Sequence, residues 1–393
     1  MIRYKHPDSW TKYDAVAIVG PLAAAKAAVL SLQSIPYQRS WAEKLQEVQL
    51  KREVAGTSRI EGADFTESEL DDAIAEDAAK LHTRSQRQAA AAVKTYRWIA
   101  KLPDDYPIDE TLILNIHRSI VTGADDCPPG QLRGPDDNVT FGIPRHRGVA
   151  GGDECRDAFS RYCAALSREY RDHDPLVQAL AAHYHFAAMH PFLDGNGRTA
   201  RALEALFLQR CGLRDTLFIA MSNYYYEEKN AYLNALAQVR SAEHDLTPFL
   251  VFGLTGIETQ CNRLLAEIRV NMEKVLFRDQ MYALFNRLKS KRKRVIAERQ
   301  IRILTLLLER DYTLDELEVA TEGVYARLKN PWSALVRDIN GLLQLSAIGY
   351  RRLKDGEYLL FVRREWPTEI TETEFFRRVE QMPTAKTHGF LNH

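Results

Sequence analysis

The residues best suited to chemistry lie in one short segment. His190 is followed four residues later by Asp194 and then by a glycine-rich turn. Pro191 disfavours helical geometry in the residue before it, so a helix beginning at Asp174 must end near His190. An imidazole titrates near neutral pH and can act as a general base. The segment therefore predicts a base at the end of one helix, facing the loop that follows.

That loop and the next helix have the features of an anion site. Gly195 and Gly197 have no side chains, so a ligand can approach their N–H groups. Arg198 and Arg201 are three residues apart in the first turn of the next helix, where their charge opposes the helix dipole. An anion would relieve this conflict, and helix N-termini bind phosphate well. The pattern favours a polyphosphate, with Asp194 able to hold magnesium through one carboxylate.

Simpler interpretations compete with this one. A lone histidine at a helix end is often a capping residue, and an Asp-Gly-Asn-Gly run is often only a turn. His183, His185 and His190 could also be metal ligands. They lack the i, i+4 spacing of zinc sites, however, and no cysteine or carboxylate lies near them on the helix.

The run from His190 to Arg201 resembles the signature of the Fic family, HxFx(D/E)GNGRxxR, at every specified position. The resemblance covers roughly residues 40–260. It implies a mainly α fold, a Fic/Doc-type helical bundle with one β-hairpin flap. It also implies that His190 deprotonates a Ser, Thr or Tyr hydroxyl of a target protein, whose oxygen attacks the α-phosphate of ATP. Asp194 would hold Mg²⁺ between the α and β phosphates.

The resemblance assigns further residues to ATP and to the target. Tyr232 is similar to the aromatic residue that flanks the adenine, although it could equally be a core tyrosine. Arg133 and the strand Asn138–Gly142 resemble the flap, whose edge would pin a target segment through main-chain hydrogen bonds. The flap edge comprises Thr140, Phe141 and Gly142. The ATP-binding residues implied around the phosphates are Gly195, Asn196, Gly197, Arg198, Thr199 and Arg201.

A second motif, Thr57–Gly62, resembles the [S/T]xxxE[G/N] pattern of the family's N-terminal inhibitory helix. Thr57 and Glu61 are one turn apart on one helix face, and Gly62 suits a helix end. In the family this glutamate pairs with the second arginine of the signature, here Arg201, and ATP then binds badly aligned. The resemblance implies autoinhibition of AMP transfer. The same glutamate could instead orient a water that hydrolyses an AMP–protein ester, so removal of AMP is an alternative activity.

The chain is expected to have several parts. Its 393 residues are enough for two or three domains. Three helical patterns and a hairpin signal around Asp355-Gly356 predict a small winged helix-turn-helix domain. The predicted divisions are an N-terminal helical region with the inhibitory motif (1–90), a Fic domain (91–290), a winged helix-like domain (291–365) and a loosely held C-terminal tail (366–393).

Charge and composition restrict the partners. Lys+Arg and Asp+Glu are both 53, so no global field favours nucleic acid or acidic lipid. The basic run at 291–294 and Arg351-Arg352 could still contact DNA, which leaves an ATP-sensing DNA-binding regulator as a third function. The target protein stays unknown and could be the chain itself; a homodimer is compatible with the class. With no signal peptide and no apolar run of about 18 residues, a cytoplasmic protein outside the membrane is expected.

Overall fold

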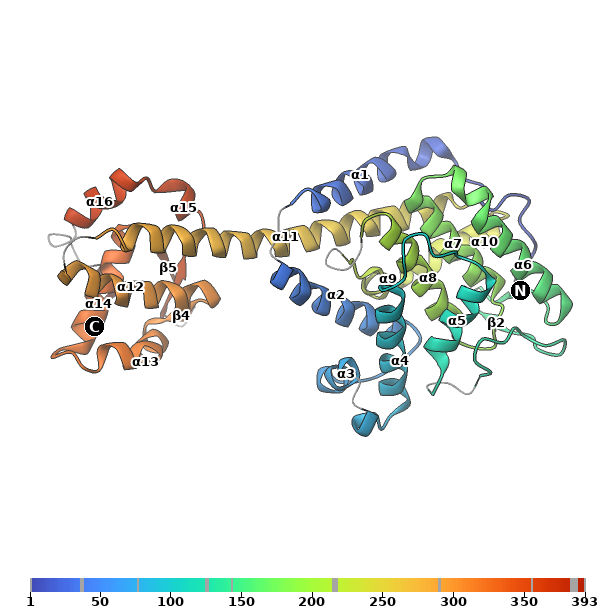
Figure 1. The fold of residues 1–393 in the computed structure, drawn as a ribbon, viewed down its shortest axis with the longest axis horizontal. Helices are drawn as coiled ribbons and strands as arrows, with labels where there is room; N and C mark the ends of the chain where they lie inside the picture. The colour runs from blue at the N-terminus through green and yellow to red at the C-terminus, as the bar shows by residue number, and fades with distance from the viewer. Residues whose placement is uncertain are drawn as a thin grey trace. The chain divides into compact units, whose positions relative to one another are not determined.

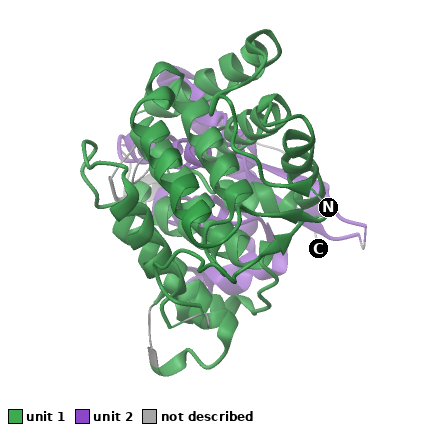
Figure 2. Ribbon diagram, turned by 90° about the vertical axis from the view of Figure 1, so that its right-hand side faces the viewer, with its two compact units in different colours: residues 1–266 green, residues 267–393 purple. Residues whose placement is uncertain are grey.

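The chain divides into two compact units, residues 1–266 and 267–393, which Figures 1 and 2 show and which are described separately. The division falls inside α11 (Thr247–Phe285), a 39-residue helix. The predicted division at residue 290 lies beyond this helix, and no division separates residues 1–90 from the Fic region. The computed structural model describes residues 2–35, 39–75, 78–123, 127–142, 144–213, 218–288, 291–354, 356–381 and 388–391.

Unit 1 is built mainly from helices, which confirms that part of the predicted fold class. Nearly every side chain of α7 and α8 is buried, so these two helices form the centre of the unit. In chain order the elements of the unit are β1 (Ile2–Arg3), α1 (Ala15–Gln33), α2 (Arg39–Ile60), α3 (Glu67–Ile74), η1 (Ala78–Lys80), α4 (Arg84–Ile99), α5 (Glu110–Val121), β2 (Thr140–Phe141), β3 (His146–Arg147), α6 (Asp153–Ser167), η2 (Glu169–Asp172), α7 (Pro175–Met189), α8 (Asn196–Arg210), α9 (Met221–Glu227), α10 (Lys229–Ser241) and the first part of α11.

Several helices begin where local chemistry predicts. The capping box of Thr66 and Glu69 is present, with each side chain bonded to the other residue's backbone N–H. Asp109 caps α5, and Asp174 caps α7 by accepting from the N–H of Leu176. The helix starts were therefore predictable because each depends on residues a few positions apart.

Helix α1 differs from what the sequence predicts in two ways. The Ala/Leu-rich pattern of residues 15–32 predicts a helix broken by Pro21, whereas Pro21 lies inside a continuous helix. The helix is also long and apolar enough to cross a membrane by length and composition, although no such segment was expected. This observation is weak support for a span, because buried core helices meet the same criteria.

The predicted flap is present as a short antiparallel pairing of β2 with β3, in which Thr140 faces Arg147 and Phe141 faces His146. Ile143, which follows the predicted strand Asn138–Gly142, lies outside the described residues. Strand β1, which the sequence did not predict, adds to β3 in parallel, and the sheet order is β1-β3-β2. Within the described chain, β2 is therefore an edge strand.

Unit 2 contains the predicted helices and hairpin. Strands β5 (Ile348–Arg352) and β6 (Tyr358–Val362) pair antiparallel, with Asp355 of the turn outside the described residues. Strand β4 (Tyr312–Thr313) adds to β6. This arrangement is compatible with the predicted winged helix-like domain. Its helices are α12 (Lys291–Glu309), α13 (Leu314–Tyr325) and α14 (Pro331–Gln344).

The described part of residues 366–393 is not the loosely held tail that the sequence predicted. Trp366 and Phe375 are buried in the core of unit 2, and the Trp366 indole donates to the Leu345 carbonyl at 2.9 Å. The described part of the tail forms α15 (Trp366–Glu369), α16 (Glu372–Gln381) and η5 (Gly389–Leu391). The segment has a polar average composition, which hid the apolar face of its helices. A helix needs only a few apolar residues on one side to pack against a core.

Candidate active site

His190 ends α7 as predicted, in the left-handed conformation with φ 55° and ψ 60°. Its Nδ1 lies 3.0 Å from the carbonyl oxygen of Ala187. A carbonyl only accepts, so Nδ1 carries the proton and Nε2 keeps its lone pair. Burial lowers the pKa of His190 to about 4, so the imidazole is neutral at pH 7. The residue therefore has the tautomer and charge that a general base needs.

Arg133 holds the chain around His190 from the base of the flap. Its Nε donates to the His190 carbonyl at 2.9 Å, and its other nitrogens donate to the carbonyls of Asp137 and Val149. The Arg133 side chain is fully buried. A Cβ at Gly148 would lie 2.9 Å from that of His190, so only glycine permits this close approach. These contacts fix the loop that begins at His190 to the flap.

The glycine-rich loop is also fixed from within. Asn196 closes it by accepting from the Phe192 N–H at 2.9 Å and donating to the Phe192 carbonyl at 2.8 Å. Gly195 has φ +75°, and a Cβ there would lie 2.6 Å from Val121 Cγ1. Helix α8 begins at Asn196, two residues before the predicted start, so the backbone of Gly197 belongs to its first turn. The loop thus presents a preformed helix N-terminus.

Arg201 is held by the predicted inhibitory motif. Its Nε donates to the Thr57 hydroxyl at 2.8 Å, and its Nη2 donates to Glu61 at 2.6 Å and to the Thr57 carbonyl at 3.1 Å. Partial burial acts to raise the pKa of Glu61, but Arg201 and Arg198 outweigh it and lower the pKa. A Cβ at Gly197 would collide with the Glu61 carboxylate. An ionised carboxylate therefore occupies the space over the start of α8.

Asp194 lies beside this cradle with its side chain half exposed. Its carboxylate accepts from the Gly195 N–H at 2.6 Å and lies 3.4 Å from Arg84 and 3.6 Å from Arg198. Among the described residues no group of three or more His, Cys, Asp or Glu side chains could hold a metal. A single carboxylate beside a polyphosphate cradle nevertheless suits Mg²⁺, which takes most of its ligands from phosphates and water.

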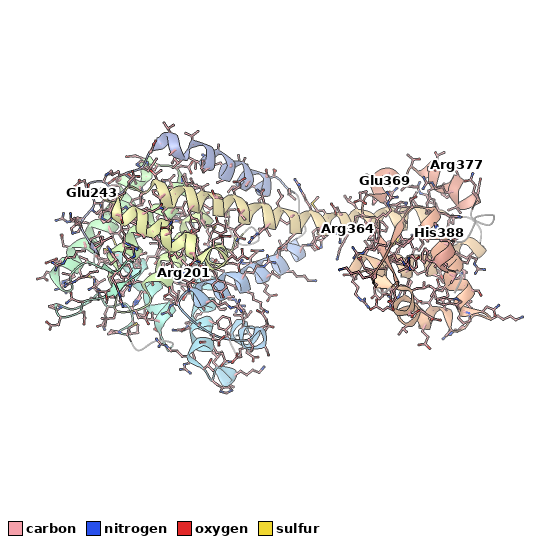
Figure 3. All side chains as sticks on the ribbon, turned by 180° about the vertical axis from the view of Figure 1, so that it is seen from behind. Arg201, Glu243, Arg364, Glu369, Arg377 and His388 are labelled. Carbon is pink, nitrogen blue, oxygen red and sulfur yellow. The ribbon has the colours of Figure 1, made fainter. Side chains whose placement is uncertain are left out.

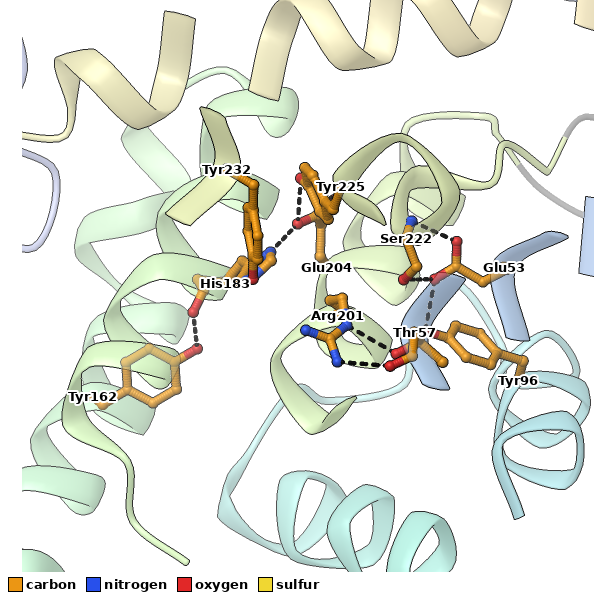
Figure 4. A network of polar contacts seen from close by, with 11 residues as sticks. Glu53, Thr57, Tyr96, Tyr162, His183, Arg201, Glu204, Ser222, Tyr225 and Tyr232 are labelled. Carbon is orange, nitrogen blue, oxygen red and sulfur yellow. Dashed lines mark hydrogen bonds and ion pairs between the residues drawn. The ribbon is translucent and has the colours of Figure 1, made fainter. Parts of the chain in front are cut away.

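Tyr232 belongs to a buried polar network (Figure 4). Its hydroxyl lies 2.9 Å from His183 Nε2, and its ring stacks on Tyr225 with centroids 4.7 Å apart. His183 Nδ1 bonds Glu204, which also accepts from the Tyr225 hydroxyl at 2.8 Å. Both ring nitrogens of His183 therefore have hydrogen-bond partners inside this network. The sequence analysis missed Tyr225 and Glu204, because their partners are distant in the chain.

A cavity of about 550 Å³ brings the predicted residues together. Arg201 lies inside unit 1 among the side chains that Figure 3 draws. Predicted residues on the cavity wall are Glu61, Phe141, Gly142, His190, Asp194, Asn196, Gly197, Arg201 and Tyr232. The predicted residues that do not line it are Thr57, Gly62, Thr140, Gly195, Arg198 and Thr199. A groove of about 710 Å³ by α4 and α5 contains none of them.

Three cations on the wall, Arg145, Lys229 and Arg240, were not predicted. Lys229 donates to the carbonyl of Ile60 at 3.1 Å, at the end of α2. The Phe141 ring stacks on the His190 imidazole with centroids 3.8 Å apart. The flap therefore covers one face of the His190 imidazole, and with Arg201 the wall carries four cationic side chains beside the carboxylates of Glu61 and Asp194.

Comparison with known proteins agrees with this geometry. Residues 107–208 match the sequence model of the Fic/DOC family, so the chain contains a Fic domain. The chain is 26% identical over 181 residues to protein adenylyltransferase fic-1 of Caenorhabditis elegans, covering 45% of this chain and 32% of that protein. It is 31% identical over 150 residues to protein adenylyltransferase Fic of Drosophila sechellia, covering 37% and 27%. The chain thus spans about a third or less of the length of these relatives.

Solved structures support the fold. A Fic family protein from Desulfovibrio desulfuricans G20 matches with a TM-score of 0.57 and 18% identity, covering 92% of this chain and 98% of the other. A Fic domain containing signaling protein from Bacteroides thetaiotaomicron VPI-5482 matches with a TM-score of 0.53 and 19% identity, covering 63% and 97%. At these identities the likeness concerns the fold alone, and it confirms the predicted Fic-type bundle.

Proposed function

We propose that this protein transfers AMP from ATP to a hydroxyl group of a protein, which could be the chain itself. The observation that carries the proposal is a single cavity that holds a neutral His190 with Nε2 available and Arg201 at the start of α8. The relatives named protein adenylyltransferase support the same reaction class.

In the proposed reaction, Nε2 of His190 takes the proton of the attacking hydroxyl. The hydroxyl oxygen forms a bond to the α-phosphorus of ATP, and the bond to the β-phosphate oxygen breaks, so pyrophosphate leaves. The N–H groups around Gly197 and the guanidinium groups of Arg198 and Arg201 would hold the phosphates. Positioning and neutralisation of charge would supply most of the rate.

Asp194 would hold Mg²⁺ in this site. The bound ion would neutralise phosphate charge. The Asp194 side chain is half exposed and points toward the cavity that Arg201 and Gly197 line. Its ion pairs with Arg84 and Arg198 would then be exchanged for the metal.

A target segment would dock on the flap. Strand β2 is an edge strand within the described chain, and Thr140 is exposed on it. An extended segment could therefore pair with the main chain of Thr140, Phe141 and Gly142. This placement would bring a target hydroxyl near His190, which contacts Phe141 directly.

The basal state would be inhibited by Glu61. Its carboxylate occupies Arg201 and the space over Gly197, so the same guanidinium cannot hold a terminal phosphate. Displacing Glu61 costs a charge-assisted hydrogen bond of about 1.5–3 kcal/mol. ATP could still enter the cavity, but its phosphates would be misplaced for attack.

Intact-mass analysis after incubation with ATP and Mg²⁺ tests this proposal. We expect Glu61→Gly to gain AMP, the wild-type protein to gain little, and Glu61→Gly/His190→Ala to gain none. Equal labelling of all three proteins would refute both residue roles.

Removal of AMP is the second candidate, since the ionised Glu61 lines the same cavity as His190 and could orient a water. Incubating pre-labelled protein with the wild type separates the two activities. Loss of AMP that requires Glu61 would favour hydrolysis.

A further inference from the structure

A second glutamate on helix α2 is buried two turns before Glu61. Glu53 is 2% exposed and lies among α2, α4 and α9. Its Oε1 accepts from the Tyr96 hydroxyl at 2.8 Å and from the Ser222 hydroxyl. Its Oε2 accepts from the Ser222 N–H at 2.8 Å (Figure 4). The carboxylate therefore joins the inhibitory helix to two other helices.

Glu53, Thr57 and Glu61 are spaced four residues apart, so they lie along one face of the helix. The last two hold Arg201, whereas the first holds Tyr96 and Ser222. One face of α2 thus carries both the contact of Glu61 with Arg201 and the hydrogen bonds of Glu53 to α4 and α9.

Between these contacts, Gly56 allows the backbones of α2 and α9 to touch. A Cβ at Gly56 would collide with the backbone carbonyl of Ser222 and the nitrogen of Asn223. Backbone atoms cannot move aside as a flexible side chain can. The glycine and two of the three hydrogen bonds of Glu53 therefore meet at the same residue, Ser222, and fix how α2 lies on α9.

Burying the Glu53 carboxylate costs free energy of folding. A buried carboxylate loses its hydration, and burial raises the pKa of Glu53 to about 7 in spite of the three donors. An apolar residue would avoid this cost. The directional hydrogen bonds of the carboxylate instead specify one position of the helix along its axis, which apolar packing would leave less defined.

We infer that Glu53 and Gly56 set the position of α2 so that Glu61 lies on Arg201, which makes Glu53 a positioning residue for inhibition. This inference rests on the proposed function, because it needs Glu61 to restrain AMP transfer. Loss of the Glu53 contacts would let the end of α2 shift and would release Arg201 without any change in the cavity wall.

Initial rates of self-labelling in a double-mutant cycle test the inference. We expect Glu53→Ala to raise labelling about tenfold over wild type, as for the loss of one or two buried hydrogen bonds. In the Glu61→Gly background, Glu53→Ala should have little further effect on the rate, because the carboxylate that Glu53 positions is absent and only the Thr57 contact with Arg201 is left. Glu47→Ala is the matched control, since Glu47 is exposed on the same helix.

Further variants keep the test decisive if Glu53→Ala folds poorly. Tyr96→Phe removes one of the three donors and should raise labelling less, in the same direction. Glu53→Gln keeps the size and one acceptor oxygen and should lie between wild type and Glu53→Ala. Thermal unfolding of each protein identifies any variant that is not folded.

The outcomes separate the two proposals. If Glu61→Gly labels but Glu53→Ala and Tyr96→Phe behave as wild type, the positioning role is overturned while the proposed function stands. Equal loss of labelling in both backgrounds would indicate general damage to the fold and would also overturn it. If Glu61→Gly itself does not label, the proposed function fails and the inference fails with it.

Discussion

Two glutamates on one face of α2 show how surroundings decide what a carboxylate does. Glu61 faces a cavity and the guanidinium of Arg201, and its pKa is lowered. Glu53 is enclosed by neutral donors, and burial raises its pKa to about 7. In the proposed function the first contact would be exchanged for a phosphate, whereas the three donors around Glu53 stay with it. On this proposal a releasable group and a fixed one share the same helix.

The comparison of the two glutamates first requires that the site beside Glu61 can catalyse AMP transfer with His190 as its base. Replacing His190 by Ala in the Glu61→Gly protein should lower the rate of AMP transfer by about 10²–10⁴, the usual contribution of a general base. Rates of labelling with radioactive ATP measure this. Retention of most of the rate would show that the base is another group.

We expect the contact of Glu61 with Arg201 to restrain AMP transfer through the charge of the carboxylate. Glu61→Gln keeps the size but weakens the bond to Arg201, so labelling should rise about tenfold or more over wild type. Glu47→Gln on the same helix is the control. An unchanged rate would indicate that Glu61 acts by its bulk over Gly197 and not by its charge.

The fixed character of Glu53 predicts a pH dependence of stability. The folded pKa, about 7, is above the usual value of 4.5. The stability that the protonated group contributes is therefore present below about pH 4.5 and is lost as the pH rises through about 7. Relative to Glu53→Gln, the wild-type free energy of unfolding should fall by about 2 kcal/mol between pH 5 and pH 8.

Urea unfolding of both proteins at several pH values checks this prediction. Taking the difference between them removes the titration of other groups. A difference that is constant with pH would contradict the raised pKa of Glu53.

The smallest expected effect concerns Thr57, which lies between the two glutamates. Its hydroxyl accepts from Arg201 Nε at 2.8 Å. Thr57→Val should weaken this contact by about 1 kcal/mol and raise labelling by roughly fivefold. No change in labelling, with the protein still folded, would show that the Glu61 contact is sufficient for inhibition.

The sequence by itself determined the parts that depend on near neighbours. The end of α7 at His190 follows from Pro191, and the α3 capping box follows from Thr66 and Glu69, because each involves residues within one turn. The loop glycines were recognisable for the same reason. The Fic fold followed because its signature is a compact local pattern.

Only the tertiary structure decided which distant groups meet. Glu53 and Ser222 are separated by 169 positions, and no local pattern marks either as a partner. The same holds for Tyr225 in the buried network and for Trp366, whose burial in unit 2 overturned the expected loose tail. Local motifs set backbone geometry within a turn or two, whereas the surroundings that raise one carboxyl pKa and lower another come from packing between helices far apart in the chain.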